Sequence, residues 1–186
     1  MRTDCTATRM VLGCVCLGLL AAGCSSDLKP TNAKLEKGLN AYFENHNECL
    51  FPAGLKFPYE VSPGVDAKGE KTHMDAMEKA GLLKQQDDLA MHVERYTLTP
   101  MGQRVAPRFC YGHKVVTSVD GFTAPVKQGG FMETTASFHA TMMDVPIWVK
   151  TDQMAAAFPK MAADVTGAQP GQMMLATAGA GWQVPQ

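Results

Sequence analysis

Apolar residues recur at helical spacing near the start of the chain. Leu35, Leu39 and Phe43 follow one another at intervals of four residues, and His46 follows three residues later. Side chains at these intervals share one face of an α-helix. Asn32 is a residue type that caps helices, so an amphipathic helix is predicted to begin there. Gly38 lies inside this helix and is expected to weaken it.

A second helix is predicted after a segment rich in proline and glycine. Thr72 is expected to cap it, Met74 and Met77 to lie on its apolar side, and Gly81 to end it. Beyond Gly81, apolar and polar residues alternate with the period of a half-buried strand. A hairpin is therefore predicted, with a polar tip at residues 84–88, whose sequence is Lys-Gln-Gln-Asp-Asp.

The hairpin leads into a short predicted helix. Thr99 can cap this helix, Pro100 suits its first position, and Pro107 must end it. The order helix, loop, helix, hairpin, helix resembles that of a winged-helix domain. The resemblance covers residues 32–107 and lies in the order of elements, not in any diagnostic residue.

The second half of the chain has the pattern of strands. Residues 111–119 and 131–145 are predicted strands, with a turn at Gly129-Gly130 between them. A helix capped by Thr151 or Asp152 is expected next, and Pro159 should interrupt it. A last short strand is predicted at residues 172–177.

These patterns predict an α+β fold. Residues 32–186 are expected to form one domain, with a helical, winged-helix-like half at 32–107. A small antiparallel sheet with one helix should occupy 108–186. Residues 24–31 are expected to be a tether, and residues 1–23 a signal peptide that is removed in the mature protein.

The expected signal peptide has the usual parts in the usual order. Arg2 and Arg9 outnumber the one acidic residue, Asp4, and an uncharged apolar run extends from 10 to 22. This run suits a signal peptide and is too short to span a bilayer as a helix. An ordinary secretory signal, cut after a small residue, is one interpretation.

The end of the apolar run supports a more specific interpretation. Its sequence is Leu20-Ala21-Ala22-Gly23-Cys24. Small residues before a cysteine resemble the lipobox of bacterial lipoproteins, although Ala21 stands where that family usually has leucine. The resemblance covers only the leader, and it implies cleavage after Gly23 and acylation of Cys24. Ser25 stands where aspartate would signal retention in the inner membrane. The resemblance therefore implies a palmitoylated lipoprotein anchored to the outer membrane and facing the periplasm.

The charge balance argues against nucleic acid as a partner. The chain has 17 basic and 18 acidic residues, and its net charge is −1 at pH 7. Proteins that bind nucleic acid usually carry a basic patch, because phosphate contacts supply most of the affinity. The expected hairpin tip at 84–88 is acidic on balance. We therefore expect no nucleic-acid partner, even though the order of elements resembles a winged helix.

The cysteines predict one disulfide. Removal of the leader and acylation of Cys24 would leave only Cys49 and Cys110 of the six cysteines. Two cysteines in an oxidising compartment are usually joined. Closing a loop of about sixty residues would stabilise the fold by roughly 4 kcal/mol. Two buried free thiols are the alternative.

Two chemical hypotheses remain beside a binding role. Cys110 and His113 are close enough in sequence for a thiolate–imidazole pair, which would suit a thiol enzyme. His73, Met74 and Met77 lie within one helical turn and could bind Cu(I) through thioether sulfur. Methionine is also a common filler of irregular cores. We assign no catalytic residue, metal or cofactor, and expect a non-catalytic envelope protein that binds a protein or a small ligand.

Overall fold

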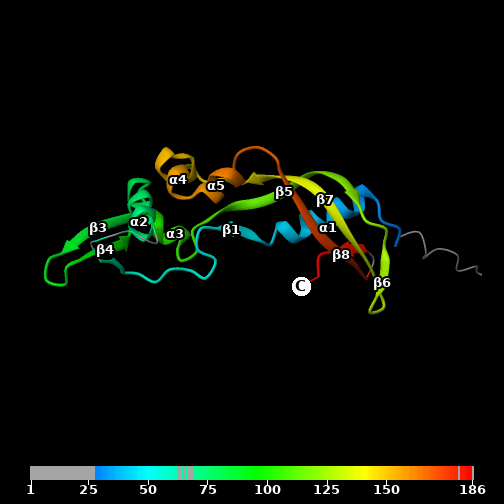
Figure 1. The fold of residues 1–186 in the computed structure, drawn as a ribbon, viewed down its shortest axis with the longest axis horizontal. Coiled ribbons are helices and arrows are strands. Elements are labelled where there is room, and N and C mark those ends of the chain that lie inside the picture. The colour runs from blue at the N-terminus through cyan, green and yellow to red at the C-terminus, as the bar shows by residue number, and fades with distance from the viewer. Residues whose placement is uncertain (1–27, 63, 65, 67–68, 180, 186) are drawn as a thin grey trace, which may run out of the picture.

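The computed structural model describes residues 28–62, 64, 66, 69–179 and 181–185. The molecule is elongated, as Figure 1 shows. The β3–β4 hairpin forms one end. Helix α1 and the strands that surround it form the other end, with α4 and α5 between the two.

The larger sheet is antiparallel and has six strands. Its order is β1-β5-β7-β8-β9, and β6 pairs with β7 outside this path. The strands are β1 (Asn47–Cys49), β5 (Cys110–Phe122), β6 (Val126–Gln128), β7 (Phe131–Met143), β8 (Gln169–Ala178) and β9 (Gly181–Gln183). The predicted strands and the Gly129-Gly130 turn are confirmed, but the sheet is larger than expected.

The sheet curls into a half-barrel around α1 (Asn32–Phe43). The register between β5 and β7 shifts between Val116 and Ser118, and again between Val119 and Gly121. Such irregularities increase the local bend and twist of a strand. They allow two long strands to wrap one helix.

Helix α1 forms where its apolar spacing predicted, and its start is corrected by one residue. Thr31, not Asn32, is the cap, and its side chain accepts a hydrogen bond from the Lys34 backbone N–H. The helix buries Leu35, Leu39 and Phe43 against the sheet. His46 lies beyond the helix and is exposed.

Gly38 allows the helix to approach the last strand closely. A Cβ added at Gly38 would lie 2.3 Å from the carbonyl oxygen of Trp182. No side chain fits at that distance. The residue that weakens the isolated helix is therefore the one that allows it to pack against β9.

The smaller sheet has three antiparallel strands in the order β2-β4-β3. Its strands and the helices beside it are β2 (Tyr59–Val61), α2 (Glu70–Lys79), β3 (Leu83–Asp88), β4 (Val93–Leu98) and α3 (Pro100–Val105). Thr99 caps α3 and Pro100 starts it, as predicted. Helix α2 begins before Thr72, after Gly69, and Gly81 follows its end with a positive φ of 78°.

The winged-helix prediction is wrong. Among the residues that the structure describes, 39% are in strands and 29% in helices, and the N-terminal half is not a helical winged-helix unit. The hairpin exists, but residues 84–88 lie within β3, because Leu83 pairs with Leu98 and Asp88 with Val93. The tip is residues 89–92. Alternation along the chain predicted the two arms, but it did not show where the pairing ends.

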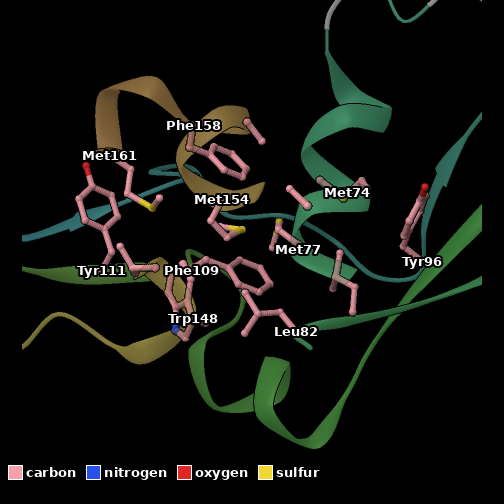
Figure 2. Close-up of a cluster of buried hydrophobic side chains, with 14 of the residues drawn as sticks. Met74, Met77, Leu82, Tyr96, Phe109, Tyr111, Trp148, Met154, Phe158 and Met161 are labelled. Atoms are coloured by element: carbon pink, nitrogen blue, oxygen red, sulfur yellow. The ribbon is translucent and has the colours of Figure 1, made fainter. Parts of the chain in front are cut away.

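Two apolar cores join residues from both halves of the chain. One lies between α1 and the larger sheet. The other, shown in Figure 2, packs α2 and the smaller sheet against residues from the second half. These come mainly from η1 (Ile147–Lys150), α4 (Asp152–Ala157) and α5 (Pro159–Asp164), with Phe109 and Tyr111 at the start of β5. Thr151 caps α4 and Pro159 starts α5, so the predicted break in the helix is confirmed.

Candidate functional site

The predicted disulfide lies where β1 meets β5. Cys49 and Cys110 are cross-strand neighbours, and their sulfur atoms are joined at 2.10 Å. The backbone continues this pairing in the loop that follows, because Leu50 N–H donates to the Phe109 carbonyl. The disulfide prediction is confirmed. It covalently links the segment after α1 to the first long strand of the sheet.

The thiol-enzyme hypothesis requires a free thiol at Cys110, but the sulfur of this residue is part of the disulfide. Cys110 bonds to Cys49 and has no thiol to ionise. His113 lies further along β5, where its Nδ1 is 3.5 Å from the exposed Asp144 carboxylate. The structure therefore does not bring a thiolate and His113 together as the thiol-enzyme hypothesis requires.

A polar cluster lies beside the disulfide, where α5 packs against β5. The Tyr111 hydroxyl donates to Asp164 Oδ2 at 2.7 Å, and Lys160 Nζ donates to the same oxygen at 2.6 Å. Glu48 of β1 accepts from Lys114 at 2.6 Å and from Lys160 at 3.4 Å. Two lysines and two carboxylates thus share one network around a tyrosine.

The cluster keeps both carboxyl groups ionised. Burial by itself would raise the pKa of Asp164, but the hydrogen bonds from Lys160 and Tyr111 outweigh burial and lower it. The pKa of Glu48 is lowered in the same way, because its bonds to Lys114 and Lys160 outweigh burial. Burial raises the pKa of Tyr111, and the Asp164 carboxylate adds to the rise, so this hydroxyl stays protonated. The cluster therefore consists of stable charges and a fixed donor.

A pocket of about 180 Å³ opens next to this cluster. Its walls include the Cys49 side of the disulfide, Tyr111, Lys160, Phe158 and His73. The His73 ring stacks on Phe158, with 4.5 Å between ring centroids. Such a pocket has an apolar wall and a few polar groups, which is the usual composition of a small-molecule site. Sequence reasoning missed it, because its walls come from four segments far apart in the chain.

The methionines of the copper hypothesis are part of the apolar core. Met74 and Met77 lie in the same cluster as Met154 and Met161, and Figure 2 shows all four among aromatic side chains. His73 is on the same helix, stacked on Phe158. This arrangement matches the use of methionine as a flexible core filler. Within the described part of the chain, no group of three or more His, Cys, Asp or Glu side chains is placed to hold a metal ion.

A serine, an aspartate and a histidine also meet on the exposed surface of the larger sheet. Asp120 accepts from the Ser118 hydroxyl at 3.1 Å, and its other oxygen lies 2.8 Å from His139 Nδ1. A hydrolytic triad needs the imidazole between the serine and the acid. Here the carboxylate is in the middle, so this is a surface hydrogen-bond group and not a catalytic arrangement.

Two hairpin tips carry exposed apolar side chains that the sequence analysis did not single out. Leu89 and Met91 at the β3–β4 tip are 83% and 64% exposed. Val126 and Phe131 of the β6–β7 hairpin are 57% and 54% exposed. Large apolar groups that protrude in this way commonly mark contacts with proteins or membranes. Their signal in the sequence is weak, because exposure depends on register.

The predicted signal peptide at 1–23, Cys24 and Ser25 lie outside the described residues. Among the helices that are described, none combines the length and the apolarity that crossing a bilayer requires. No protein-family model, curated protein or solved structure matches this chain.

Proposed function

We propose that this protein is a bacterial envelope lipoprotein, attached by lipid on Cys24 to the periplasmic face of the outer membrane. The observation that carries the proposal is the sequence from Leu20 to Cys24 at the end of an apolar run. A bilayer anchor then needs no membrane-spanning helix, because two or more acyl chains hold a protein stably at a membrane.

The disulfide supports export from the cytosol. Stable disulfides form in oxidising compartments such as the periplasm and are rare in the cytosol. Cys49 and Cys110 are paired in the structure. An exported lipoprotein meets the conditions under which this bond persists.

The role that we propose at the membrane is binding. The β3–β4 tip presents Leu89 and Met91 at the far end of the molecule from α1, where a neighbouring envelope protein can reach them (Figure 1). Apolar side chains at the centre of a contact supply much of the binding energy of protein interfaces. The pocket of about 180 Å³ beside Tyr111 offers a second, smaller place for binding.

Replacing the proposed lipid attachment residue tests the anchor. Cys24→Ala is expected to accumulate as an uncut precursor or to leave the membrane fraction. Intact-mass measurement of the wild-type protein should show an acylated N-terminus at Cys24. A Cys24→Ala variant that is processed and fractionates like wild type would contradict the proposal.

The sorting position has its own test. Ser25→Asp is expected to move the protein from outer-membrane to inner-membrane fractions on a density gradient, while Ser25→Ala should leave it in place. An unchanged position of the Ser25→Asp variant, with Cys24 acylated, would remove the assignment to the outer membrane and leave the anchor intact.

A further inference from the structure

The β6–β7 hairpin carries two large apolar side chains on one face. Val126 pairs with Glu133, and Gln128 pairs with Phe131. Residues that are directly opposite share a face, and so do residues two apart on one strand. Val126 and Phe131 therefore lie on the same face of the hairpin, together with Gln128 and Glu133, and both apolar side chains are more than half exposed. Lys127 lies on the other face and is also exposed.

This hairpin lies at the end of the molecule where the described chain starts. The side-chain amide of Asn32, at the start of α1, donates to the Val119 carbonyl on β5 at 2.9 Å. Strand β5 ends three residues later, at Phe122, shortly before β6. Figure 1 shows the start of α1 and β6 at the same end, opposite the β3–β4 hairpin. Leu28 and Lys29, which precede α1, are both exposed.

The lipid attachment proposed above places a bilayer close to this end. Cys24 is four residues before Leu28. A chain of this length spans at most about 14 Å when fully extended. The acylated residue and its membrane surface must therefore lie within that reach of Leu28, on the side of the molecule that carries the β6–β7 hairpin.

We propose that the β6–β7 hairpin rests on the phospholipid surface and inserts Val126 and Phe131 among the lipid head groups. This inference depends on the proposed acylation of Cys24. Moving apolar side chains from water to the acyl boundary lowers the free energy of the system. Lysine can extend its ammonium group to lipid phosphates, which suits the exposed Lys29. With this end of the molecule on the membrane, the opposite end extends away from it, so that Leu89 and Met91 point toward the periplasm.

A photocrosslinking experiment on the full chain tests this contact. The acylated protein is placed in vesicles of phosphatidylethanolamine and phosphatidylglycerol, with a benzoylphenylalanine at position 131 or, as the matched control, at position 89. Position 89 is also at an apolar hairpin tip and is more exposed, at 83% against 54%. We expect lipid adducts at position 131 to exceed those at position 89 by ten-fold or more.

Several outcomes would overturn the inference. Equal lipid labelling at the two positions would show that the molecule has no fixed orientation. Crosslinks from position 131 to a second copy of the chain would assign this face to self-association. A probe at position 126 gives an independent reading, and its labelling must agree with that of position 131 for the contact to stand.

The acylation state separates the two proposals. If Cys24 carries lipid by mass and neither probe labels lipid, the anchor stands and only the orientation is wrong. If Cys24 carries no lipid, both proposals are wrong.

Discussion

Tyr111 on β5 donates a hydrogen bond of 2.7 Å to Asp164 on α5, across 53 residues of sequence. Lys160 bonds the same carboxylate oxygen from one helical turn away. Because Asp164 is only 15% exposed, this link is partly shielded from water. The hydrogen bond connects α5, which is part of the apolar core shared with α2, to β5, the long strand that also carries Cys110.

Asp164 is expected to make the fold sensitive to acid. Its folded pKa is lowered, so its contribution to stability is present above the ordinary carboxyl pKa of about 4 and is lost as pH falls through the folded value. Asp164→Asn should reduce the free energy of unfolding at pH 7 by about 1–3 kcal/mol. It should also flatten the fall in melting temperature between about pH 5 and pH 2. Thermal scans across this range measure both effects.

Glu78→Gln is a suitable control for this experiment, because Glu78 is an exposed carboxyl on α2. We expect its melting temperature to follow the wild-type pH profile. An Asp164→Asn profile as steep as that of wild type would show that the carboxylate does not contribute in the way that its contacts indicate.

Loss of the disulfide is expected to destabilise the whole molecule. Cys49→Ser and Cys110→Ser should each reduce the free energy of unfolding by about 2–5 kcal/mol and lower the melting temperature by several degrees. The double variant should be as stable as the less stable of the two single variants, because all three variants lack the same disulfide bond. Mass spectrometry that finds both thiols free in the oxidised protein would refute the pairing.

Gly38→Ala is expected to destabilise the fold although alanine favours helices. The added Cβ would meet the Trp182 carbonyl oxygen at 2.3 Å and push α1 away from β9. Overpacking of this kind typically costs about 1–3 kcal/mol, which exceeds the helix-propensity gain of about 1 kcal/mol. Denaturant unfolding measures the net effect.

Gly121→Ala is the matched control, because nothing lies within 4 Å of the position where its Cβ would be placed. This variant should have a stability within about 0.5 kcal/mol of wild type. Equal stability of the two alanine variants would mean that α1 and β9 are not in the close contact described.

The β3–β4 tip is expected to serve binding and not stability. Leu89→Ser combined with Met91→Ser should change the free energy of unfolding by less than about 0.5 kcal/mol, because both side chains are largely in water. The same change should weaken crosslinking to partner proteins in intact envelopes. Ile147→Ser, at an 81% exposed apolar position elsewhere, is the matched control and should leave that crosslinking unchanged.

One result would count against this role of the hairpin. A tip variant that unfolds several degrees below wild type would indicate that Leu89 and Met91 pack against the fold.

Steeply salt-dependent retention of the purified protein on duplex DNA would contradict the expectation that a protein with a net charge of −1 has no nucleic-acid partner.

The sequence by itself determined the local features of this protein. Thr99-Pro100 starts α3, Thr151 caps α4, and Pro159 separates it from α5, as predicted. Each feature depends on groups within about one helical turn, so nearby residues specify it. Counting cysteines also predicted the disulfide, because the expected maturation left only two of them.

Only the tertiary structure decided which segments lie together. Helix α1, from the first half of the chain, packs inside the sheet formed mainly by the second half, while α4 and α5 join the core of the first half. Strand β1 has only three residues and pairs with β5 across more than sixty positions. Alternation of apolar and polar residues indicates that a strand has two different faces, but it does not determine which strand pairs with it or in which register. These follow from the packing of distant segments, which no local pattern specifies.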